Sequence, residues 1–443
     1  MMRGKNIGII VIAVMMICPI WTNAQDLFIK NGTLLTVTKG TIENGDILIR
    51  NGIIQKIGRN LAPPPGIKVI DATGKYVIPG LIDPHTHIAI TDINESSETI
   101  TPEVSVEDVL NADDPRIYYA LTGGVTIVHT MHGSGNPIGG QNIVLKLTWG
   151  RPSEEMVVHE AFKTIKFALG ENPKQSYFNP PTPRYPKTRM GVAAIIRREF
   201  MKAKAYMEKW DRYQRLKESK NPPEFLMAPR RDLRMETLAD VLKGKTWVRC
   251  HTYRADETLE LVNLSKELRF KIACVDHASE AYKIAKELAA EGIGASMFID
   301  TWAYKMETAE GIAYNAAYCA KNGVVVSLNS DSGPQMMYLF NDAAKAMKYG
   351  GLSESEALKL ITLNPAIHLG VEKIVGSLEA GKHGDLAIFS EHTLSSSTCC
   401  EMTIIEGEIY FDRAAYLEER EKKQKEREEQ EEKSKKKKEG GRG

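Results

Sequence analysis

Short apolar runs alternate with helical segments across residues 78–375, and this alternation limits most strongly what the chain can fold into. Each run has the composition of a buried strand, and the helical segments between the later runs carry apolar residues at a 3.6-residue spacing and end at glycine. Such alternation predicts a parallel sheet, and over this length a TIM-like (β/α)8 barrel in the α/β class. The candidate strands are residues 81–87, 124–130, 164–170, 246–251, 272–277, 293–298 and 324–331.

β-rich segments lie on both sides of this predicted barrel. Residues 27–77 contain strand-like runs separated by Asn-Gly turns, and the pattern returns after Gly376. The simplest arrangement joins residues 25–77 and 376–412 in one small β-sandwich domain, with the barrel of residues 78–375 inserted between its halves. Residues 413–443 are mainly Glu, Lys, Arg and Gln, so we expect a solvated helix or a disordered tail there.

The first 24 residues have the pattern of an export signal. Arg3 and Lys5 precede an apolar run over residues 7–17, and small residues stand at the usual cleavage spacing before residue 25. Eleven apolar residues are too few to span a bilayer easily, so we expect cleavage and no stable membrane span in the mature chain. The pattern therefore predicts a periplasmic or extracellular protein.

Two histidines end the first candidate strand. His85 and His87 are two residues apart, and side chains at this spacing leave a strand on the same face, so both imidazoles can converge on one ion. Other polar residues stand at later strand ends, at intervals that match whole strand-helix units of a barrel with roughly 31 residues per unit. The intervals place Lys166 on strand 4, His251 on strand 5, His277 on strand 6 and Asp331 on strand 8.

The interval between Lys166 and His251 is too long for one unit, so residues 172–245 form an insertion after strand 4. Loops that follow barrel strands emerge at the face where barrel active sites lie, and the insertion should border that face. A surface excursion or a contact within a homo-oligomer is the alternative. Arg184 and Arg189 lie in this segment, and an arginine fork suits a substrate carboxylate, although a surface arginine paired with an acid has the same sequence appearance.

Residues 133–147 are rich in glycine and follow strand 2. They lack the phosphate-binding pattern that ends in Lys and Ser or Thr, so we expect a shaped loop near the substrate rather than a nucleotide site. His129 and His132 are candidate substrate-contacting residues there, with packing or solvent exposure as the alternatives.

The charge balance bears on the partner. The chain carries 58 basic and 57 acidic residues, a formal net charge of +1, so no global field attracts nucleic acid or an anionic membrane. The expected partner is a small-molecule substrate.

Three segments resemble the amidohydrolase superfamily in its imidazolonepropionase-like and prolidase-like branch: residues 77–87, 360–371 and 376–389. The resemblance implies that His85, His87 and Asp331 hold one divalent metal ion and that His251 and His277 hold a second, zinc or a similar ion. It further implies that Lys166 becomes a carbamate that bridges the two ions, with Glu171 as the rival bridge. Without a bridge, the site holds one ion.

The resemblance also implies an activity. A bound water activated by the metal would attack an amide-type C–N bond of a small amide, dipeptide or cyclic amide, with Asp331 as the general base. A deaminase of a small heterocycle is the nearest alternative, but His251 is not followed by the His-x-x-Glu pattern that those enzymes usually show. A non-catalytic metal-containing binding protein is the third reading.

Overall fold

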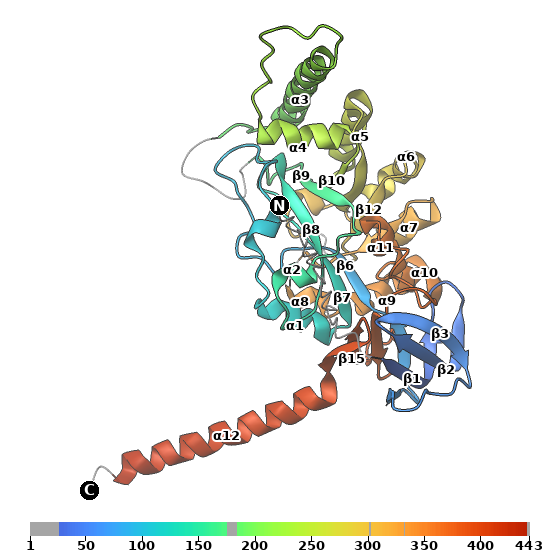
Figure 1. Cartoon of the computed structure of the whole chain (residues 1–443). Coiled ribbons are helices and arrows are strands. Elements are labelled where there is room, and N and C mark those ends of the chain that lie inside the picture. Colours follow the sequence, from blue (N-terminus) through green and yellow to red (C-terminus); the bar gives the residue numbers. More distant parts are fainter. Residues whose placement is uncertain (1–25, 175–183, 301–302, 332, 441–443) are drawn as a thin grey trace, which may run out of the picture.

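The computed structural model describes residues 26–174, 184–300, 303–331 and 333–440. Two sheets organise this part of the chain, a barrel sheet in the middle of the sequence and a second sheet built from both chain ends. Figure 1 shows the second sheet beside one end of the barrel, and the segment of residues 1–24 lies outside the described residues.

The barrel sheet has eight strands that neighbour one another in sequence order. The segment that follows its last strand donates a hydrogen bond from the Asp331 amide to the His85 carbonyl on its first strand, 3.1 Å long, so the sheet closes almost completely. The strands are β6 (Leu81–Thr86), β7 (Val125–Thr130), β8 (Ile138–Lys146), β9 (Lys163–Ala168), β10 (Thr246–Thr252), β11 (Ile272–His277), β12 (Gly294–Met297) and β13 (Val326–Leu328).

The third barrel strand, β8, corrects the sequence-based prediction. Most of residues 133–147, expected to be a loop, form this strand, and β8 runs antiparallel to both β7 and β9 whereas the other neighbouring pairs are parallel. The link from Thr130 to Ile138 is too short for a parallel crossover, which needs a dozen residues or more. Gly139 and Gly140 made the segment look like a loop, because glycine is uncommon inside strands. Glycine is required at both positions, since a Cβ on either would lie within 3 Å of His132 or Val104.

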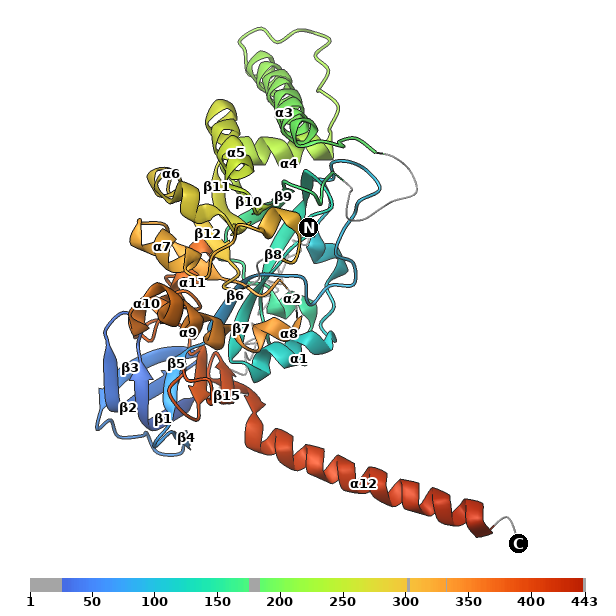
Figure 2. The same ribbon diagram turned by 180° about the vertical axis from the view of Figure 1, so that it is seen from behind.

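Helices surround the barrel (Figure 2), and α1, α4, α5, α7, α9 and α11 contact its strands, the last of them packing on both β6 and β13. They bury apolar faces in one continuous core that also contains the outward side chains of the strands. The helices that follow the strands are α1 (Pro115–Thr122), α2 (Ser153–Met156), α5 (Ala255–Leu268), α6 (Ala285–Ala290), α7 (Asn315–Lys321), α8 (Gly333–Met336), α9 (Leu339–Gly350), α10 (Glu354–Lys359) and α11 (Leu363–Leu369).

The second sheet joins the two chain ends, as predicted, but the described strands form one branched sheet rather than the two separate sheets of a sandwich. Its hydrogen-bonded order is β16-β15-β14-β5-β1-β2-β3, and β4 pairs with β1. It encloses a hydrophobic core of its own. The strands are β1 (Leu27–Leu35), β2 (Thr41–Arg50), β3 (Ile53–Arg59), β4 (Lys68–Asp71), β5 (Tyr76–Pro79), β14 (Leu386–Phe389), β15 (Cys400–Ile405) and β16 (Glu408–Asp412).

The segment after strand 4 contains α3 (Arg189–Lys217) and α4 (Leu233–Leu242). Thr188 caps α3 by accepting a hydrogen bond from the Gly191 amide, and the helix buries its first half through residues such as Phe200, which stacks on Phe270 with ring centroids 4.8 Å apart. The second half of α3 extends away from the barrel (Figures 1 and 2). The start of α3, rather than its length, therefore lies near the barrel mouth.

The last helix, α12 (Arg413–Gly440), extends away from the rest of the chain (Figure 1). Its first turn is held by Tyr416, whose ring lies 6.1 Å from that of Tyr118 and 6.2 Å from that of Phe411. In the described part of the chain, no helix combines the length and the apolar character needed to cross a membrane.

Candidate metal centre

The six residues predicted as metal ligands come together at one end of the barrel. Their positions are the carboxyl ends of four strands and the segment that follows β13, as the count of strand-helix units predicted. They are His85 on β6, His87 directly after β6, Lys166 on β9, His251 on β10, His277 on β11 and Asp331 beyond β13.

Asp331 lies at the middle of this cluster. Its Oδ1 is 3.4 Å from His85 Nε2 and 3.3 Å from His87 Nε2. One potential ligand atom from each of His85, His277 and Asp331 lies within 4.8 Å of the others. His87 is oriented from behind, because its Nδ1 lies 2.7 Å from the Met131 carbonyl and its Nε2 therefore faces the cluster.

His251 and Lys166 extend the cluster. The ring of His277 lies 4.7 Å from that of His251 and 4.7 Å from that of His85, so the imidazoles form a continuous set. Lys166 is fully buried, and its Nζ lies 2.8 Å from His85 Nε2. Glu171 lies beyond the end of β9, with its backbone amide held by the Glu307 carboxylate at 3.0 Å.

Three buried imidazole nitrogens have no hydrogen-bond partner among the described residues, His85 Nδ1, His251 Nε2 and His277 Nδ1. Of these, His85 Nδ1 lies 3.4 Å from an Asp276 carboxylate oxygen. Leaving such an atom unsatisfied costs about 1–3 kcal/mol, and native proteins rarely accept that cost without a ligand or another role. Imidazole and carboxylate are ligands that zinc and similar divalent ions take. The residues present therefore fit a divalent metal ion.

The charge states suit metal ligation as well. Burial, reinforced by the Lys166 ammonium, lowers the pKa of His85 to about 4, and burial holds the pKa of His277 well below its usual range. Burial alone would raise the pKa of Asp331, but His277, His87 and His85 hold it well below its usual range. Burial lowers the pKa of Lys166 to about 8. The cluster thus offers neutral imidazoles, an anionic carboxylate and a lysine that loses its proton easily.

Two residues of the cluster have unusual backbone conformations. His277 has φ of 67° and Asp331 has φ of 59°, in the left-handed region that residues with a Cβ seldom adopt. Strain of this kind persists where surrounding contacts enforce it, and it gathers at functional sites. The hydrogen bond from the Asp331 amide to the His85 carbonyl is one such contact.

Sequence reasoning missed the charged residues beneath the cluster. Asp83, Arg249 and Asp276 have no exposed surface. A usable signal existed for two of them, since Asp83 precedes His85 by two residues and Arg249 precedes His251 by two, which places each on the same strand face as its histidine. Asp83 ties the barrel ends together by accepting hydrogen bonds from the Ser330 hydroxyl, the Ser330 amide and the His85 amide.

His129 and His132, the candidate substrate contacts, occupy packing positions. His129 is fully buried, with Nδ1 3.2 Å from the Pro84 carbonyl and Nε2 2.9 Å from the Thr164 hydroxyl. His132 Nε2 accepts from the Glu95 amide at 2.9 Å, so its Nδ1 donates to the Gly133 carbonyl. Both rings match the packing alternative.

Arg184 and Arg189 contact protein acceptors. The Arg184 guanidinium donates to the carbonyls of Ser96 and Gly135, at 2.5 and 2.6 Å, and to the Glu98 carbonyl. Arg189 pairs with Glu257 and lies 3.4 Å from the Glu307 carboxylate. These contacts do not test the predicted binding of a substrate carboxylate, although each occupies a donor that such binding needs.

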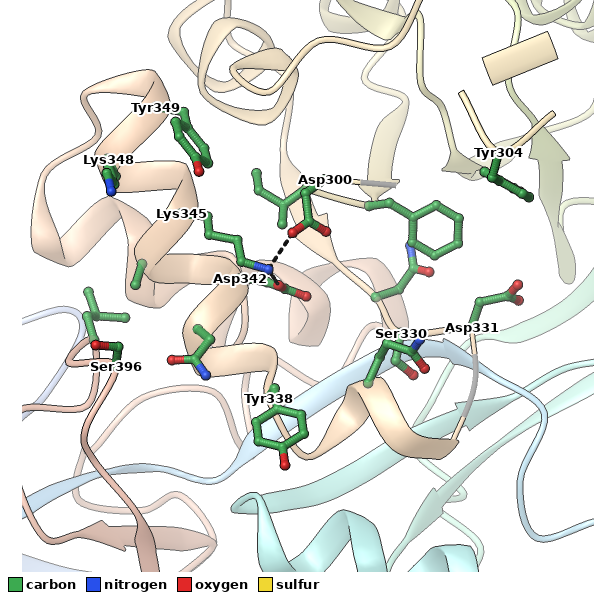
Figure 3. Close-up of a pocket in the computed structure, with 17 residues that line it drawn as sticks. Asp300, Tyr304, Ser330, Asp331, Tyr338, Asp342, Lys345, Lys348, Tyr349 and Ser396 are labelled. Atoms are coloured by element: carbon green, nitrogen blue, oxygen red, sulfur yellow. Dashed lines mark hydrogen bonds and ion pairs between the residues drawn. The ribbon is translucent and has the colours of Figure 1, made fainter. Parts of the chain in front are cut away.

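A cavity of about 880 Å³ opens beside Asp331. Figure 3 shows Ser330 and Asp331 at one side of it, and α9 at the other, where Lys345 pairs with Asp300 and Asp342 at 2.5 and 2.9 Å. The volume lies in the range of small-molecule sites. The lining includes amide side chains and aromatic rings, namely Phe298, Asn329, Gln335, Tyr338, Asn341 and Tyr349.

Comparison with known sequences gives two family matches, each over part of the chain, and relatives of which this chain spans less than half. Two profiles described as Amidohydrolase family match residues 276–410 and 68–112. Amidohydrolase tasK of Hapsidospora irregularis is 28% identical over 404 residues, which cover 85% of this chain and 41% of that protein. A dihydroorotase of Trichlorobacter lovleyi is 43% identical over 64 residues, 14% of this chain and 15% of that protein. The chain thus spans about two fifths of tasK and a smaller share of the dihydroorotase.

A solved structure matches over the whole of its own length. The crystal structure of an amidohydrolase from Thermotoga maritima is 36% identical, with a TM-score of 0.78, and the match covers 87% of this chain and 100% of that one.

Proposed function

From the premise that this chain belongs to the amidohydrolase family, hydrolases that act on carbon–nitrogen bonds, we propose that it hydrolyses an amide-type C–N bond of a small molecule at the cluster around Asp331. One observation carries the proposal. Four imidazoles, an anionic carboxylate and a buried lysine converge at the barrel end, and the nitrogens His251 Nε2 and His277 Nδ1 have neither a hydrogen bond nor an ion pair among the described residues.

The proposed ligands divide into two sets. His85, His87 and Asp331 would hold one divalent ion, zinc or a similar metal, and His251 and His277 would hold a second. Lys166 would bridge them after its uncharged amine has combined with carbon dioxide to give a carbamate, since a lysine ammonium has no lone pair to donate. When bound, the metal lowers the pKa of water toward neutrality and polarises a carbonyl oxygen.

Asp331 has the position of a general base. Its carboxylate lies among the imidazoles and borders the cavity, so it can reach both a water at the cluster and a substrate in the cavity. It would take a proton from the attacking water and deliver it to the leaving nitrogen. The low pKa that the neighbouring imidazoles impose keeps Asp331 in the form that accepts the proton.

The cavity beside Asp331 would receive the substrate. Its amide side chains match the donors and acceptors of an amide, and its aromatic rings provide apolar surface for the remainder of a small ligand. These features support a small linear amide, a dipeptide or a cyclic amide as the substrate class, in agreement with the imidazolonepropionase-like or prolidase-like branch. The relative named dihydroorotase supports the cyclic amide among these.

Export of the chain is a further part of the proposal. The basic residues, apolar run and small residues within the first 24 positions support cleavage before residue 25. Amino-terminal sequencing of the protein recovered from its native host checks this, and a mature protein that retains residues 1–24 contradicts it.

The activity is tested with the full chain before and after removal of metal. Purified protein is assayed against a panel of dipeptides, N-acyl amino acids and cyclic amides, then treated with a chelator and reloaded with zinc. We expect hydrolysis of at least one class, loss on chelation and recovery on reloading. Hydrolysis that persists in the metal-free protein would show that the cluster is not the site.

A further inference from the structure

A buried ion pair lies directly behind His85. Arg249 on β10 and Asp276 on β11 both have side chains with no exposed surface. Arg249 Nη2 donates to Asp276 Oδ1, and Arg249 Nε lies 3.3 Å from Asp276 Oδ2, so the guanidinium holds the carboxylate through two donors.

Both residues of this pair contact the segment that carries His85. Asp276 Oδ1 lies 3.4 Å from His85 Nδ1. Arg249 Nη2 also donates to the carbonyl of Pro84, the residue before His85, at 3.1 Å. Asp276 therefore contacts the His85 ring at Nδ1, and Arg249 contacts the backbone just before His85.

The other nitrogen of the same ring faces the cluster. His85 Nε2 lies 3.4 Å from Asp331 Oδ1 and 2.8 Å from Lys166 Nζ. A ring whose Nδ1 carries the proton leaves the Nε2 lone pair available for a metal ion. A carboxylate behind Nδ1 favours that tautomer and fixes the ring plane.

We propose that Asp276 is a positioning residue for His85, and that Arg249 holds the Asp276 carboxylate where it orients the imidazole toward the metal ion. The inference rests on the proposed metal site, and it is independent of the substrate. Arg249 has a second task in this arrangement. A carboxylate fully removed from water is costly without a compensating charge, and the guanidinium supplies that charge without competing for the imidazole.

A purely structural ion pair is the opposing explanation. Such a pair would stabilise the barrel interior and leave metal affinity unchanged when its charge is altered. The chain offers a matched control in Asp385, a carboxylate of 2% exposed side chain that pairs with Lys146 at 3.0 Å in the junction between the two sheets. Asp385 belongs to neither ligand set.

The test compares zinc affinity in Asp276→Asn and Asp385→Asn, made in the full chain. Zinc is titrated into the metal-free proteins in competition with a chromophoric chelator, and the melting temperature is measured alongside. We expect Asp276→Asn to weaken zinc binding by about 10- to 100-fold, because loss of a partner behind a ligand commonly has that effect. Asp385→Asn should lower the melting temperature and leave the zinc Kd within about threefold of the parent.

A second variant guards against misfolding of Asp276→Asn. Arg249→Met combined with Asp276→Leu removes both charges together, so no unpaired charge stays buried. We expect it to bind zinc as weakly as Asp276→Asn. Histidine ¹⁵N spectra of the metal-free parent should show one ring protonated at Nδ1 that loses this state in either variant.

The outcomes separate the two proposals. Zinc affinity equal to the parent in both Asp276 variants overturns the positioning role and leaves the metal site standing. A parent protein that takes up no zinc overturns the metal site and the positioning role together. A selective loss in the Asp276 variants, with none in Asp385→Asn, supports both.

Discussion

Two clusters of ionisable side chains, one between the two sheets and one at the barrel end around Asp331, differ in the partners that the protein provides for them. We call the set of Lys146, His383, Asp385 and Glu406 the junction cluster. In it, Lys146 Nζ on β8 lies 3.0 Å from Asp385, 2.7 Å from Glu406 and 2.7 Å from His383 Nδ1, and so connects the barrel to the second sheet. Asp385 Oδ2 makes no hydrogen bond, but the Lys146 ammonium is its ion-pair partner. We call His85, His87, Lys166, His251, His277 and Asp331 the metal cluster, and in it His251 Nε2 and His277 Nδ1 have neither a hydrogen bond nor an ion pair among the described residues.

This difference indicates which polar side chains contribute to stability and which are available to bind a ligand. In the junction cluster one cation meets two carboxylates from the other sheet, so the protein supplies its own counter-charge and the cluster acts on stability. In the cluster around Asp331 the protein gathers imidazoles and a carboxylate, which are the ligands that a divalent ion would take. The comparison predicts that substitutions in the first cluster change unfolding and that those in the second change metal binding and turnover.

The largest expected effect is that of Asp331→Asn. The amide keeps a ligating oxygen but cannot accept a proton, and general-base catalysis is commonly worth about 10²- to 10⁴-fold in rate. We expect kcat to fall by that factor, while zinc content and melting temperature stay near those of the parent. Steady-state kinetics on a substrate found in the panel, with elemental analysis of the same sample, measure both. A kcat within tenfold of the parent assigns the base to another residue.

The junction cluster is expected to respond in the opposite way. Lys146→Met leaves the buried Asp385 carboxylate without its cation, and removing one partner of a buried pair costs about 3–5 kcal/mol. Urea unfolding should show that loss in the free energy of unfolding, with the zinc Kd unchanged. Lys266→Met is the control, because Lys266 pairs with Glu291 at the surface, where an ion pair contributes at most about 1 kcal/mol. Equal losses in the two variants would break the comparison.

The bridging role of Lys166 sharpens the metal side of the comparison. We expect close to two zinc ions per parent chain and about one in Lys166→Ala, because the second ion loses its bridge. Elemental analysis after loading in bicarbonate-containing buffer measures the number. One ion per chain in both proteins would exclude a carbamate bridge and would leave hydrolysis at a single metal in place.

The metal cluster was predictable because strand geometry is strict. Alternation places His85 and His87 on one face, and the repeat of strand-helix units placed Lys166 and His251 on the strands that carry them and Asp331 at the end of the last strand, three residues past which it lies. The prediction of a loop at β8 was wrong, because the glycines of β8 are not typical of a strand. Its antiparallel direction follows from the short link to β7. The sequence of this segment alone does not show that its glycines allow the backbone to approach His132 and Val104 closely.

The supporting charges were harder to predict because a sequence shows which residues share a face but not which partners meet across the barrel. Arg249 shares its strand face with His251, yet its partner Asp276 comes from the next strand and its other acceptor is the Pro84 carbonyl. The hydrogen-bond partners of Arg184 could not be predicted for the same reason, since they are backbone carbonyls distant in the sequence. Such contacts arise from tertiary packing alone.

The smallest expected effect concerns Arg189, at the start of α3. Its guanidinium already pairs with Glu257 and with Glu307, whose side chain is 1% exposed, so we expect Arg189→Ala to lower kcat/KM by less than about threefold, equally for a carboxylate substrate and for its amide. Arg197→Ala is the control, because Arg197 lies farther along α3 and pairs with Glu267. A loss of about tenfold confined to the carboxylate substrate would instead establish Arg189 as an anchor, since one charge-assisted contact contributes roughly 1.5–3 kcal/mol.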